Sequence, residues 1–431
     1  MYQENLRLND LEFEHGHLYL YSRPRVLGIV LGDACNLRCI HCYQSHKGTA
    51  LLRPAAMGAE LRRELTGLYP FLSMLRIHGG EVFVLDGFAG LLDDAAAMTS
   101  RPIVSISTNG TLIDEAWAER IVRTPWLSLT VSIDAGTPRT FAALRRGGDL
   151  NQVIENIRRI QRWKQRLASE LPAVDSFFVV MRSNYREIPQ YLDLMRREGI
   201  DEVALQTLEV TGAVEHEAIT GTREVRELHG ILRESMASGG FRRISATGLR
   251  GLFEAHGLDA AFLTEGLHPD AAAMDTSLCP NPWTTLFVTE NGDVHLCFLS
   301  TPTGNIYQSS LASIWNSPAA ITKRADMSAG RFSKSGCSPQ YCGWREGRSK
   351  PSPPMAALEE FQALRRKAAQ WVDPPRADGG IGAVRETLEA RERRIAELEA
   401  LFARLCDTNA EFHERGRAYI EELERLLARQ C

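Results

Sequence analysis

The sequence Leu31-Gly-Asp-Ala-Cys35-Asn-Leu-Arg-Cys39-Ile-His-Cys42 places three cysteines in the spacing C-x3-C-x2-C. Thiolates are the soft ligands that iron–sulfur clusters require. Three of them on one loop would leave the fourth iron of a [4Fe–4S] cluster without a protein ligand, and therefore open to a substrate or cofactor. The apolar run from Val26 to Leu31 predicts a buried strand that ends at this loop. A zinc knuckle or unrelated buried thiols are the alternative interpretation.

The chain of 431 residues is too long for one ordinary core, so two or three domains are expected. Its hydrophobic content of 44% and charged content of 24% are typical of globular proteins. The net charge of −4 gives no electrostatic reason to expect nucleic acid or an anionic membrane as a partner. We find no secretory signal and no apolar run of about 20 residues, so a cytoplasmic location is expected. Nine clustered cysteines then favour metal ligation over disulfides.

Between residues 26 and 212, apolar strand-like runs alternate with amphipathic segments. This alternation predicts an α/β fold with a parallel sheet and crossover helices. Six such units would form a partial (β/α)6 TIM-like barrel, whose loops at the carboxyl ends of the strands carry the chemistry. The predicted strands are Val26–Leu31, Met74–His78, Ile103–Ser107, Leu127–Ile133, Ser176–Met181 and Glu202–Leu208, and predicted helices include Gly58–Tyr69 and Asn151–Leu167.

Two segments beside the barrel carry less distinct patterns. Residues 1–25 form a preamble in which Phe13–Tyr21 is predicted to be a hairpin around Gly16, too short for a separate peptide-recognition domain. Residues 213–278 contain a predicted helix over Thr222–Met236, followed by turns and short helices over Gly239–Gly266. We find no metal-ligand spacing or nucleotide loop there, so this region is predicted to be a bridge that closes one side of the barrel.

Four further motifs follow the cysteine loop in order. They are Ile77-His-Gly-Gly-Glu81, Val104-Ser-Ile-Ser-Thr-Asn109-Gly110, Leu129-Thr-Val-Ser132-Ile-Asp134 and Leu144-Arg145-Arg-Gly-Gly148. Together with the cysteine spacing, their order resembles the signature of the radical S-adenosylmethionine (SAM) superfamily over residues 26–160. One departure is Val82, where the family commonly has proline, so the turn after Glu81 is expected to differ in detail.

The resemblance implies a role for the cysteine loop and for the Gly-Gly-Glu motif. A [4Fe–4S] cluster would be held by Cys35, Cys39 and Cys42, and the amino and carboxylate groups of SAM would chelate its open iron. Gly79 and Gly80 would let backbone approach the methionine moiety without a Cβ atom. Glu81 would accept a hydrogen bond from the SAM ammonium group. Taken without the cysteine loop, Gly-Gly-Glu would indicate only a turn.

The resemblance also implies contacts with the rest of SAM. Ser132 and Asp134 occupy positions where the family contacts the ribose, although Ser-Ile-Asp at a strand end is also typical of a helix cap. Arg145 aligns with an arginine that pairs with the SAM carboxylate, and its neighbour Arg146 is the alternative. His41 stands where the family often has an aromatic residue near the adenine, a solvated loop histidine being the alternative. Other candidate contacts at strand ends are Asn109, Asn184 and Gln206, and no catalytic acid or base is identified.

A second cysteine-rich region begins at Cys279. The segment from Cys279 to Cys297 predicts a hairpin around Asn291-Gly292 that brings its two flanking cysteines together. With Gly304-Asn-Ile-Tyr, Leu311–Trp315 and Cys337-x4-Cys342, the order over residues 279–350 resembles the auxiliary-cluster domain called SPASM, or its shorter relative, twitch. The ligands of one auxiliary [4Fe–4S] cluster would be Cys279, Cys297, Cys337 and Cys342. A four-thiolate zinc site is the alternative.

The tail, residues 351–431, lies outside the family pattern. A helix is predicted over Met355–Trp371, and residues 381–426 show a heptad seam that carries Asn409 at an interior position. This seam predicts a coiled coil that binds a second copy or a partner protein, whereas folding back onto the enzyme is the alternative. Cys406 and Cys431 are expected to be unligated thiols.

The resemblance implies an oxidoreductase or modifying enzyme. An electron from a flavodoxin- or ferredoxin-like donor would reach SAM through the cluster, and the resulting 5′-deoxyadenosyl radical would abstract a hydrogen atom from the substrate. The auxiliary cluster would then accept an electron, giving oxidation or cross-linking. The first hypothesis for the substrate is a ribosomally made peptide, and the alternative is a small molecule such as a sugar or aminocyclitol. A third hypothesis is a non-catalytic assembly protein that uses the coiled coil.

Overall fold

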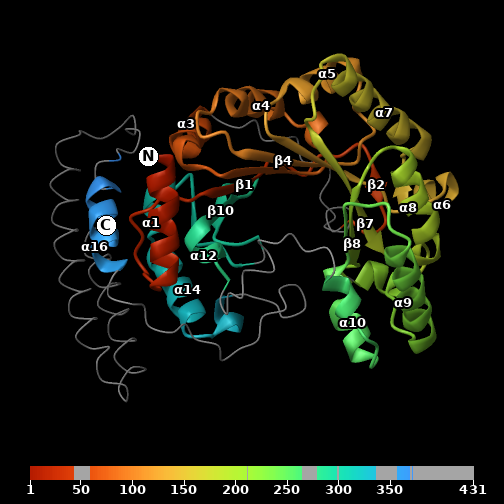
Figure 1. The fold of residues 1–431 in the computed structure, drawn as a ribbon. Helices are drawn as coiled ribbons and strands as arrows, with labels where there is room; N and C mark the ends of the chain where they lie inside the picture. The colour runs from red at the N-terminus through yellow and green to blue at the C-terminus, as the bar shows by residue number, and fades with distance from the viewer. Residues whose placement is uncertain are drawn as a thin grey trace.

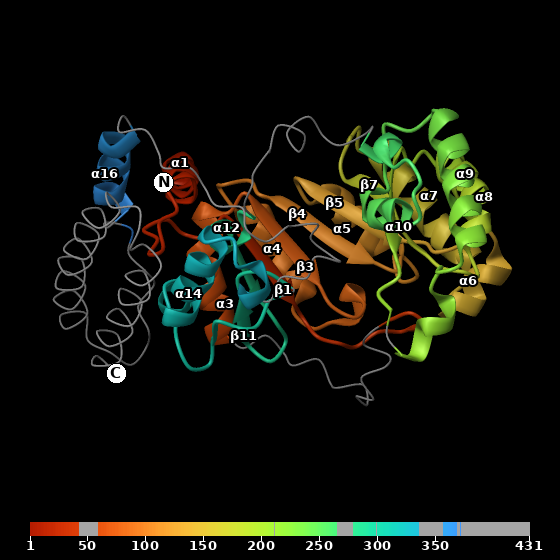
Figure 2. The same ribbon diagram turned by 90° about the horizontal axis from the view of Figure 1, so that it is seen from below.

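The computed structural model describes residues 1–42, 59–210, 212–264, 279–298, 300–335, 357–368 and 371. Within these residues ten strands form one sheet in the order β12-β11-β10-β1-β3-β4-β5-β7-β8-β9 (Figures 1 and 2). All pairings from β10 to β9 are parallel. The six strands that the sequence predicted are β1 (Val26–Val30), β3 (Met74–His78), β4 (Ile103–Thr108), β5 (Leu127–Ser132), β7 (Ala173–Val180) and β8 (Glu202–Thr207), which confirms the α/β partial barrel.

Helices follow these strands and cover one side of the curved sheet (Figure 1). They are α3 (Ala59–Leu68), α4 (Phe88–Ala97), α5 (Glu115–Arg123), α6 (Pro138–Leu144), α7 (Leu150–Arg166), α8 (Ile188–Arg197) and α9 (Thr222–Ala237). Alternate strand residues such as Leu75, Ile77, Leu129 and Val131 are fully buried in the hydrophobic core. The residues between them face the opposite side of the sheet, which we call the inner face.

The region after β8 adds a strand that the sequence did not predict. β9 (Arg243–Ser245) pairs in parallel with β8, and α10 (Arg250–Ala255) follows it. The predicted helix is present as α9, and α10 is one of the short helices expected over Gly239–Gly266, but β9 was not expected. Three residues are too few to show the alternating pattern of a strand. The pairing with β8 places β9 in the sheet.

The predicted hairpin in residues 13–21 is also wrong. Residues Tyr2–Glu14 form helix α1, and Leu8 and Leu11, three positions apart, are fully buried on one face. The helix ends before Gly16, which takes a φ of +66° that suits glycine. The Glu12 carboxylate accepts hydrogen bonds from the backbone of Tyr21 and Ser22, so the segment after α1 turns back along the helix.

The auxiliary region is joined to the edge of the barrel sheet. β10 (Thr285–Val288) and β11 (Asp293–His295) form the predicted hairpin, and Gly292 in its turn has a φ of +85°. β10 pairs in parallel with β1, which the sequence did not reveal. The remaining elements of the region are α12 (Asn281–Thr284), β12 (Gly304–Asn305), α13 (Leu311–Trp315) and α14 (Pro318–Ser328).

The buried Arg324 connects the auxiliary region to the N-terminal segment. Its guanidinium donates to the carbonyls of Leu18, Pro282 and Trp315, at 2.7–2.9 Å. Trp283 donates from its indole to the carbonyl of His17 at 2.7 Å. The N-terminal segment therefore packs as part of the auxiliary region's core.

Helix α16 (Ala357–Ala368) lies beside α1, as Figures 1 and 2 both show. Phe361 and Ala368 are buried against Leu8, Leu11 and Tyr21. This confirms a helix in residues 355–371. The predicted seam at 381–426, with Asn409, Cys406 and Cys431, lies outside the described residues. No helix in the described ranges has the length and apolar character needed to cross a membrane.

Candidate functional site

The cysteine loop follows β1 and is fixed by the loop after β3. The backbone N–H groups of Gly80 and Glu81 donate to the carbonyls of Gly32 and Ala34, at 2.8 and 2.9 Å. A Cβ atom on Gly80 would lie 2.2 Å from the Ala34 oxygen, and one on Gly79 would lie 2.4 Å from the Leu85 side chain. In this structure the two glycines therefore allow the cysteine loop to pack closely. This packing explains why both positions are glycine without invoking SAM. The approach of the backbone to the methionine moiety stays a prediction.

Glu81 is fully buried beneath the cysteine loop. Its carboxylate accepts hydrogen bonds from Thr108 Oγ1 and from the backbone N–H of Asn109, both at 2.7 Å. Burial raises the pKa of Glu81, and these hydrogen bonds oppose the rise. Both carboxylate oxygens already have protein donors, so the side chain holds the end of β4 in place. A direct contact with the SAM ammonium group stays a prediction.

Asn109 connects this strand end to the cysteine loop. Its amide donates to Cys35 Sγ at 3.8 Å and to Asn36 Oδ1 at 2.9 Å, and Asn36 in turn donates to Thr111 Oγ1 at 2.8 Å. Asn109 thus contacts a predicted cluster ligand, as an N–H···S donor. Asn36 and Thr111 were not predicted as site residues, and the only signal for either is the position of Asn36 inside the cysteine motif.

Asp134 is fully buried and joins two segments that the sequence treated separately. Its Oδ2 atom lies 2.6 Å from Arg145 Nη2 and 3.0 Å from His41 Nε2. Burial alone would raise the pKa of Asp134, but the charge of Arg145 and the contact with His41 lower it to about 2. In this structure Asp134 is therefore the counter-charge of Arg145, and its contact with the SAM ribose stays a prediction.

Arg145 also contacts the cysteine loop directly. β2 (Arg38–Cys39) pairs with β6 (Arg145–Arg146), and Arg145 Nη1 donates to Cys39 Sγ at 3.9 Å. The buried Nε of Arg145 and Nδ1 of His41 have no hydrogen-bond partner in the described structure. Two unsatisfied polar atoms beside the cysteines fit a polar ligand such as SAM.

The remaining residues that were predicted to contact SAM or the substrate differ in burial and in hydrogen bonding. Ser132 is half-buried at the end of β5, and Arg146 is exposed. Asn184 is buried, and its amide donates to the carbonyls of Asp134 and Val179. It therefore braces the segment after Asp134 and has no open polar group. Gln206 is exposed near the end of β8.

The three loop cysteines suit a cluster better than a single metal ion. All are half-buried, and their sulfurs are close enough that the charge of one raises the pKa of another, as at Cys35 and Cys39. Burial raises the pKa of Cys39 to about 11, and Arg145 opposes that rise. In the described ranges no three metal-binding side chains converge on one point. In a [4Fe–4S] cluster each thiolate binds a different iron, so such convergence is not needed.

The described auxiliary cysteines lie at the opposite end of the barrel strands. Cys279 precedes α12 and Cys297 follows β11, so both flank the amino end of β10, which is level with the amino end of β1. Asn281 donates to Cys297 Sγ at 3.7 Å. The two cysteine groups are separated by about the length of the five-residue β1, roughly 16 Å. Cys337 and Cys342 lie outside the described residues.

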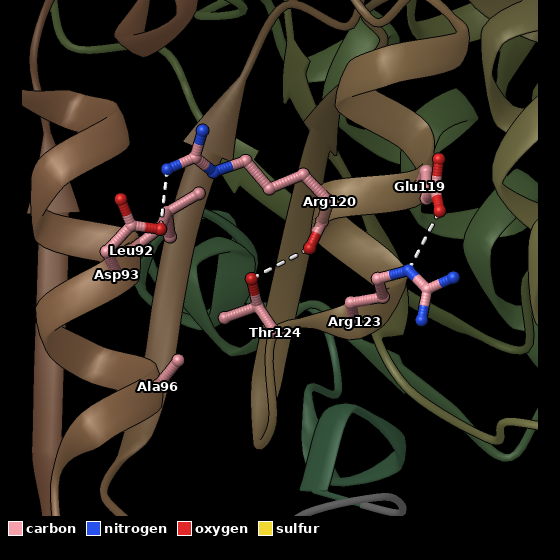
Figure 3. A pocket seen from close by; sticks show the side chains of 7 residues that line it. All are labelled: Leu92, Asp93, Ala96, Glu119, Arg120, Arg123 and Thr124. Carbon is pink, nitrogen blue, oxygen red and sulfur yellow. Dashed lines mark hydrogen bonds and ion pairs between the residues drawn. The ribbon is translucent and has the colours of Figure 1, made fainter.

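A surface groove between α4 and α5 lies far from this chemistry. It is lined by Leu92, Asp93, Ala96, Glu119, Arg120, Arg123 and Thr124, whose polar groups largely pair with one another (Figure 3). The groove is on the helix-covered side of the sheet, and no cysteine or strand-end residue lines it. We therefore assign the chemistry to the inner face.

The comparison with known families agrees with this geometry. Residues 29–169 match the radical SAM superfamily, and residues 279–343 match the iron–sulfur cluster-binding domain called SPASM. The chain therefore contains a radical SAM domain and a SPASM domain. It accordingly binds a SAM-associated [4Fe–4S] cluster, SAM and an auxiliary [4Fe–4S] cluster.

Curated relatives of this radical SAM protein include GTP 3′,8-cyclases. The one from Caulobacter vibrioides is 29% identical over 191 residues, which cover 42% of this chain and 51% of the relative. GTP 3′,8-cyclase 1 from Pseudomonas aeruginosa is 26% identical over 223 residues, covering 50% of this chain and 65% of the relative. The chain thus spans about half the length of the first curated relatives it matches.

Solved structures with a similar fold include two radical SAM proteins at 16% identity. Streptococcus suis SuiB bound to precursor peptide SuiA gives a TM-score of 0.52, covering 71% of this chain and 67% of SuiB. The protein anSMEcpe with bound AdoMet gives a TM-score of 0.50, covering 81% of this chain and 97% of that protein. These similarities concern the fold.

Proposed function

We propose that this radical SAM enzyme modifies a ribosomally made peptide, held on the inner face between its two cysteine groups. The observation that carries the proposal is the pairing of β10 with β1. This pairing puts the cysteine loop and the described auxiliary cysteines at opposite ends of the same strands. A substrate on the inner face would therefore lie between the site where a hydrogen atom is removed and the auxiliary site that is proposed to accept an electron.

When bound, the reduced cluster and SAM supply a radical that removes a hydrogen atom from the substrate. The protein's own residues then have three tasks in the proposal. Gly79 and Gly80 hold the cysteine loop against β3, and Asp134 neutralises Arg145 next to Cys39. Asn109 and Arg145 direct N–H groups at two of the cysteine sulfurs.

The inner face suits an extended peptide because it is polar and partly open. Its half-buried side chains include those of Ser105, Ser107, Ser128 and Thr130 on two neighbouring strands. Phe298, next to Cys297, leaves 55% of its surface exposed at the auxiliary end. Such a surface offers hydrogen-bonding groups along its length and one apolar contact.

The second candidate is modification of a small molecule. The observation that favours it is the similarity to GTP 3′,8-cyclases, which reaches 29% identity over 191 residues. Under this alternative the substrate would be a compact polar molecule, such as a nucleotide or a sugar.

The test is SAM turnover by anaerobically reconstituted, dithionite-reduced protein. Peptides encoded by short reading frames beside the gene are compared with GTP. A peptide that increases 5′-deoxyadenosine and gains or loses hydrogen atoms by mass spectrometry would support the proposal. Turnover and product formation with GTP alone would establish the second candidate instead. The variant Cys297→Ala should cleave SAM without forming the peptide product if the auxiliary site accepts the electron.

A further inference from the structure

The inner face carries a cation that no carboxylate in the described part of the chain neutralises. Arg76 lies in the middle of β3, between the fully buried Leu75 and Ile77, so its side chain projects from the opposite side of the sheet. Across the described structure, Arg76 forms no ion pair. Its polar contact is the one that Nε makes with Met74 Sδ at 3.0 Å. A thioether is a weak acceptor and carries no charge.

The guanidinium of Arg76 is in contact with solvent but partly surrounded by protein. The residue is exposed, yet the surrounding protein desolvates the guanidinium enough to lower its pKa. A partly desolvated charge without a partner is unfavourable for stability. Many other arginines of this chain, such as Arg62 and Arg158, are paired with carboxylates on the outer helices. Within the described residues Arg76 therefore has no charged partner, and its guanidinium is available to bind a substrate anion.

Two polar side chains flank the guanidinium on the same face. Ser105 on β4 is the register partner of Arg76, so their side chains leave the sheet side by side. His78 lies two residues further along β3, and burial together with the charge of Arg76 lowers its pKa to about 4. A neutral imidazole at this point can donate one hydrogen bond and accept another.

The strand on the other side of Arg76 provides an aromatic wall. Its register partner on β1 is Gly28, and a Cβ atom there would lie 2.2 Å from the Phe287 ring, so the ring takes the place of a side chain. The centroid of the Phe287 ring is 5.9 Å from that of His78 and 5.2 Å from that of Phe298. The wall thus runs from β3 to the residue after Cys297.

We propose that Arg76, His78 and Ser105 form a recognition site for an oxyanion group of the substrate, with an apolar part of the substrate against the exposed Phe298, which packs on the buried Phe287. This inference rests on the proposed function, because it places the substrate of that enzyme on the same inner face. A guanidinium fork binds either a carboxylate or a phosphate through two parallel hydrogen bonds. A peptide would bring a carboxylate, and a nucleotide would bring phosphate groups.

The site is distinct from the position expected for SAM. Arg76 lies two residues before His78, about 7 Å along the strand, and Gly79 and Gly80 come after His78. The carboxylate of SAM is expected near Arg145, beside the cysteine loop. Loss of the Arg76 charge should therefore weaken binding of the substrate anion and leave SAM binding unchanged.

The experiment measures anion binding to reconstituted protein with SAM present, by anaerobic calorimetry. The probes are N-acetylglycine for a carboxylate and tripolyphosphate for a phosphate, with N-acetylglycinamide as the uncharged control. The variants are Arg76→Gln and Arg76→Lys, and the matched control is Arg123→Gln on the helix side of the sheet. We expect Arg76→Gln to weaken one of the anions about tenfold or more and Arg76→Lys to recover part of the affinity. Arg123→Gln should bind like the wild type.

The anion that binds more tightly identifies the substrate class. The inference is overturned if neither anion binds the wild type, if Arg76→Gln binds both as tightly as Arg123→Gln does, or if Arg76→Gln weakens SAM to the same extent. SAM cleavage by the same preparations is measured in parallel. Failure of the wild type to cleave SAM would contradict the proposed function itself, whereas intact cleavage with anion binding independent of Arg76 would contradict only this inference.

Discussion

The carboxylate of Asp134 lies 2.6 Å from the guanidinium of Arg145. Both side chains are buried, and the same carboxylate contacts His41 within the cysteine motif. The ion pair therefore connects the end of β5 to two positions beside the cysteines. Its geometry predicts that the charge balance at this point controls the stability of the whole cysteine loop.

Asp134→Asn should reduce the free energy of unfolding by about 3–5 kcal/mol, because it leaves the buried Arg145 without a counter-charge. The measurement is urea denaturation of the apoprotein at neutral pH. The double variant Asp134→Asn/Arg145→Gln should lose less than the sum of the two single losses, since it removes both charges. Additive losses, or a loss below about 1 kcal/mol for Asp134→Asn, would show that the pair does not act as a unit.

Gly80→Ala should separate the cysteine loop from β3, because the new Cβ atom would lie 2.2 Å from the Ala34 carbonyl oxygen. We expect a fall in SAM cleavage of about a hundredfold, the order of loss that a displacement of about 1 Å causes in an active site. The matched control is Gly230→Ala in α9, where nothing lies within 4 Å of the added atom. This control should keep its activity and gain up to about 1 kcal/mol of stability. Equal activity of the two variants would refute the packing role of Gly80.

Asp175 gives a pH dependence of stability. Burial, assisted by the charge of Glu202, raises its pKa to about 6 in the folded protein, although hydrogen bonds from Thr130 and Ser128 oppose this. An unfolded aspartate releases its proton near pH 4. Between about pH 4 and pH 6 the folded state binds more protons, so the contribution of Asp175 to stability falls as the pH rises and is constant above that range.

Asp175→Asn should therefore stabilise the protein above pH 6 by about 1–3 kcal/mol, and have little effect near pH 4. Thermal unfolding of the wild type and the variant across pH 4 to 8 checks this. The difference between their melting temperatures should grow with pH and then level off. A difference that shrinks as the pH rises would mean that the folded-state pKa of Asp175 is lowered.

The parts of the tail before and after residue 373 are expected to have different roles. A chain ending at Asp373 keeps α16, whereas a chain ending at residue 356 loses the contact of Phe361 with Leu8 and Leu11. The first truncation should retain both clusters and SAM cleavage, and light scattering should show a lower assembly mass if the predicted seam joins copies. The second truncation should lower the melting temperature, as should Phe361→Ala, which is expected to cost about 3–5 kcal/mol. Loss of cluster binding in the first truncation would make the seam part of the enzyme core.

The strands of the barrel could be predicted because each is specified by its own residues. Met74–His78 was located to the residue from its alternation of apolar positions, and Asn291-Gly292 identified the β10–β11 hairpin. Local signals did not suffice where the partner is distant. β10 pairs with β1 across about 260 positions of the chain, and nothing within either strand specifies the other. Helix α1 has no clear apolar stripe, because its buried face includes the polar residues Asn5, Asn9 and Glu12 beside Leu8 and Leu11.

The same distinction applies to the site. The cysteine spacing and the order of the motifs identified the residues that gather at one end of the sheet. Their pairing was not predictable, because Asp134 meets Arg145 and His41 only after three segments have folded together. The role of Gly80 likewise depends on the path of the backbone at Ala34, which no sequence pattern records.

The most direct test of the account is 5′-deoxyadenosine formation from SAM by reduced, reconstituted protein, compared with the variant Cys35→Ala/Cys39→Ala/Cys42→Ala. The wild type should hold about eight irons and cleave SAM, and the variant should hold about four, keep the absorbance of the auxiliary cluster and form no 5′-deoxyadenosine. A variant that still forms 5′-deoxyadenosine, or a wild type with its full iron content that forms none, would contradict the assignment of the cysteine loop as the SAM-cleaving site.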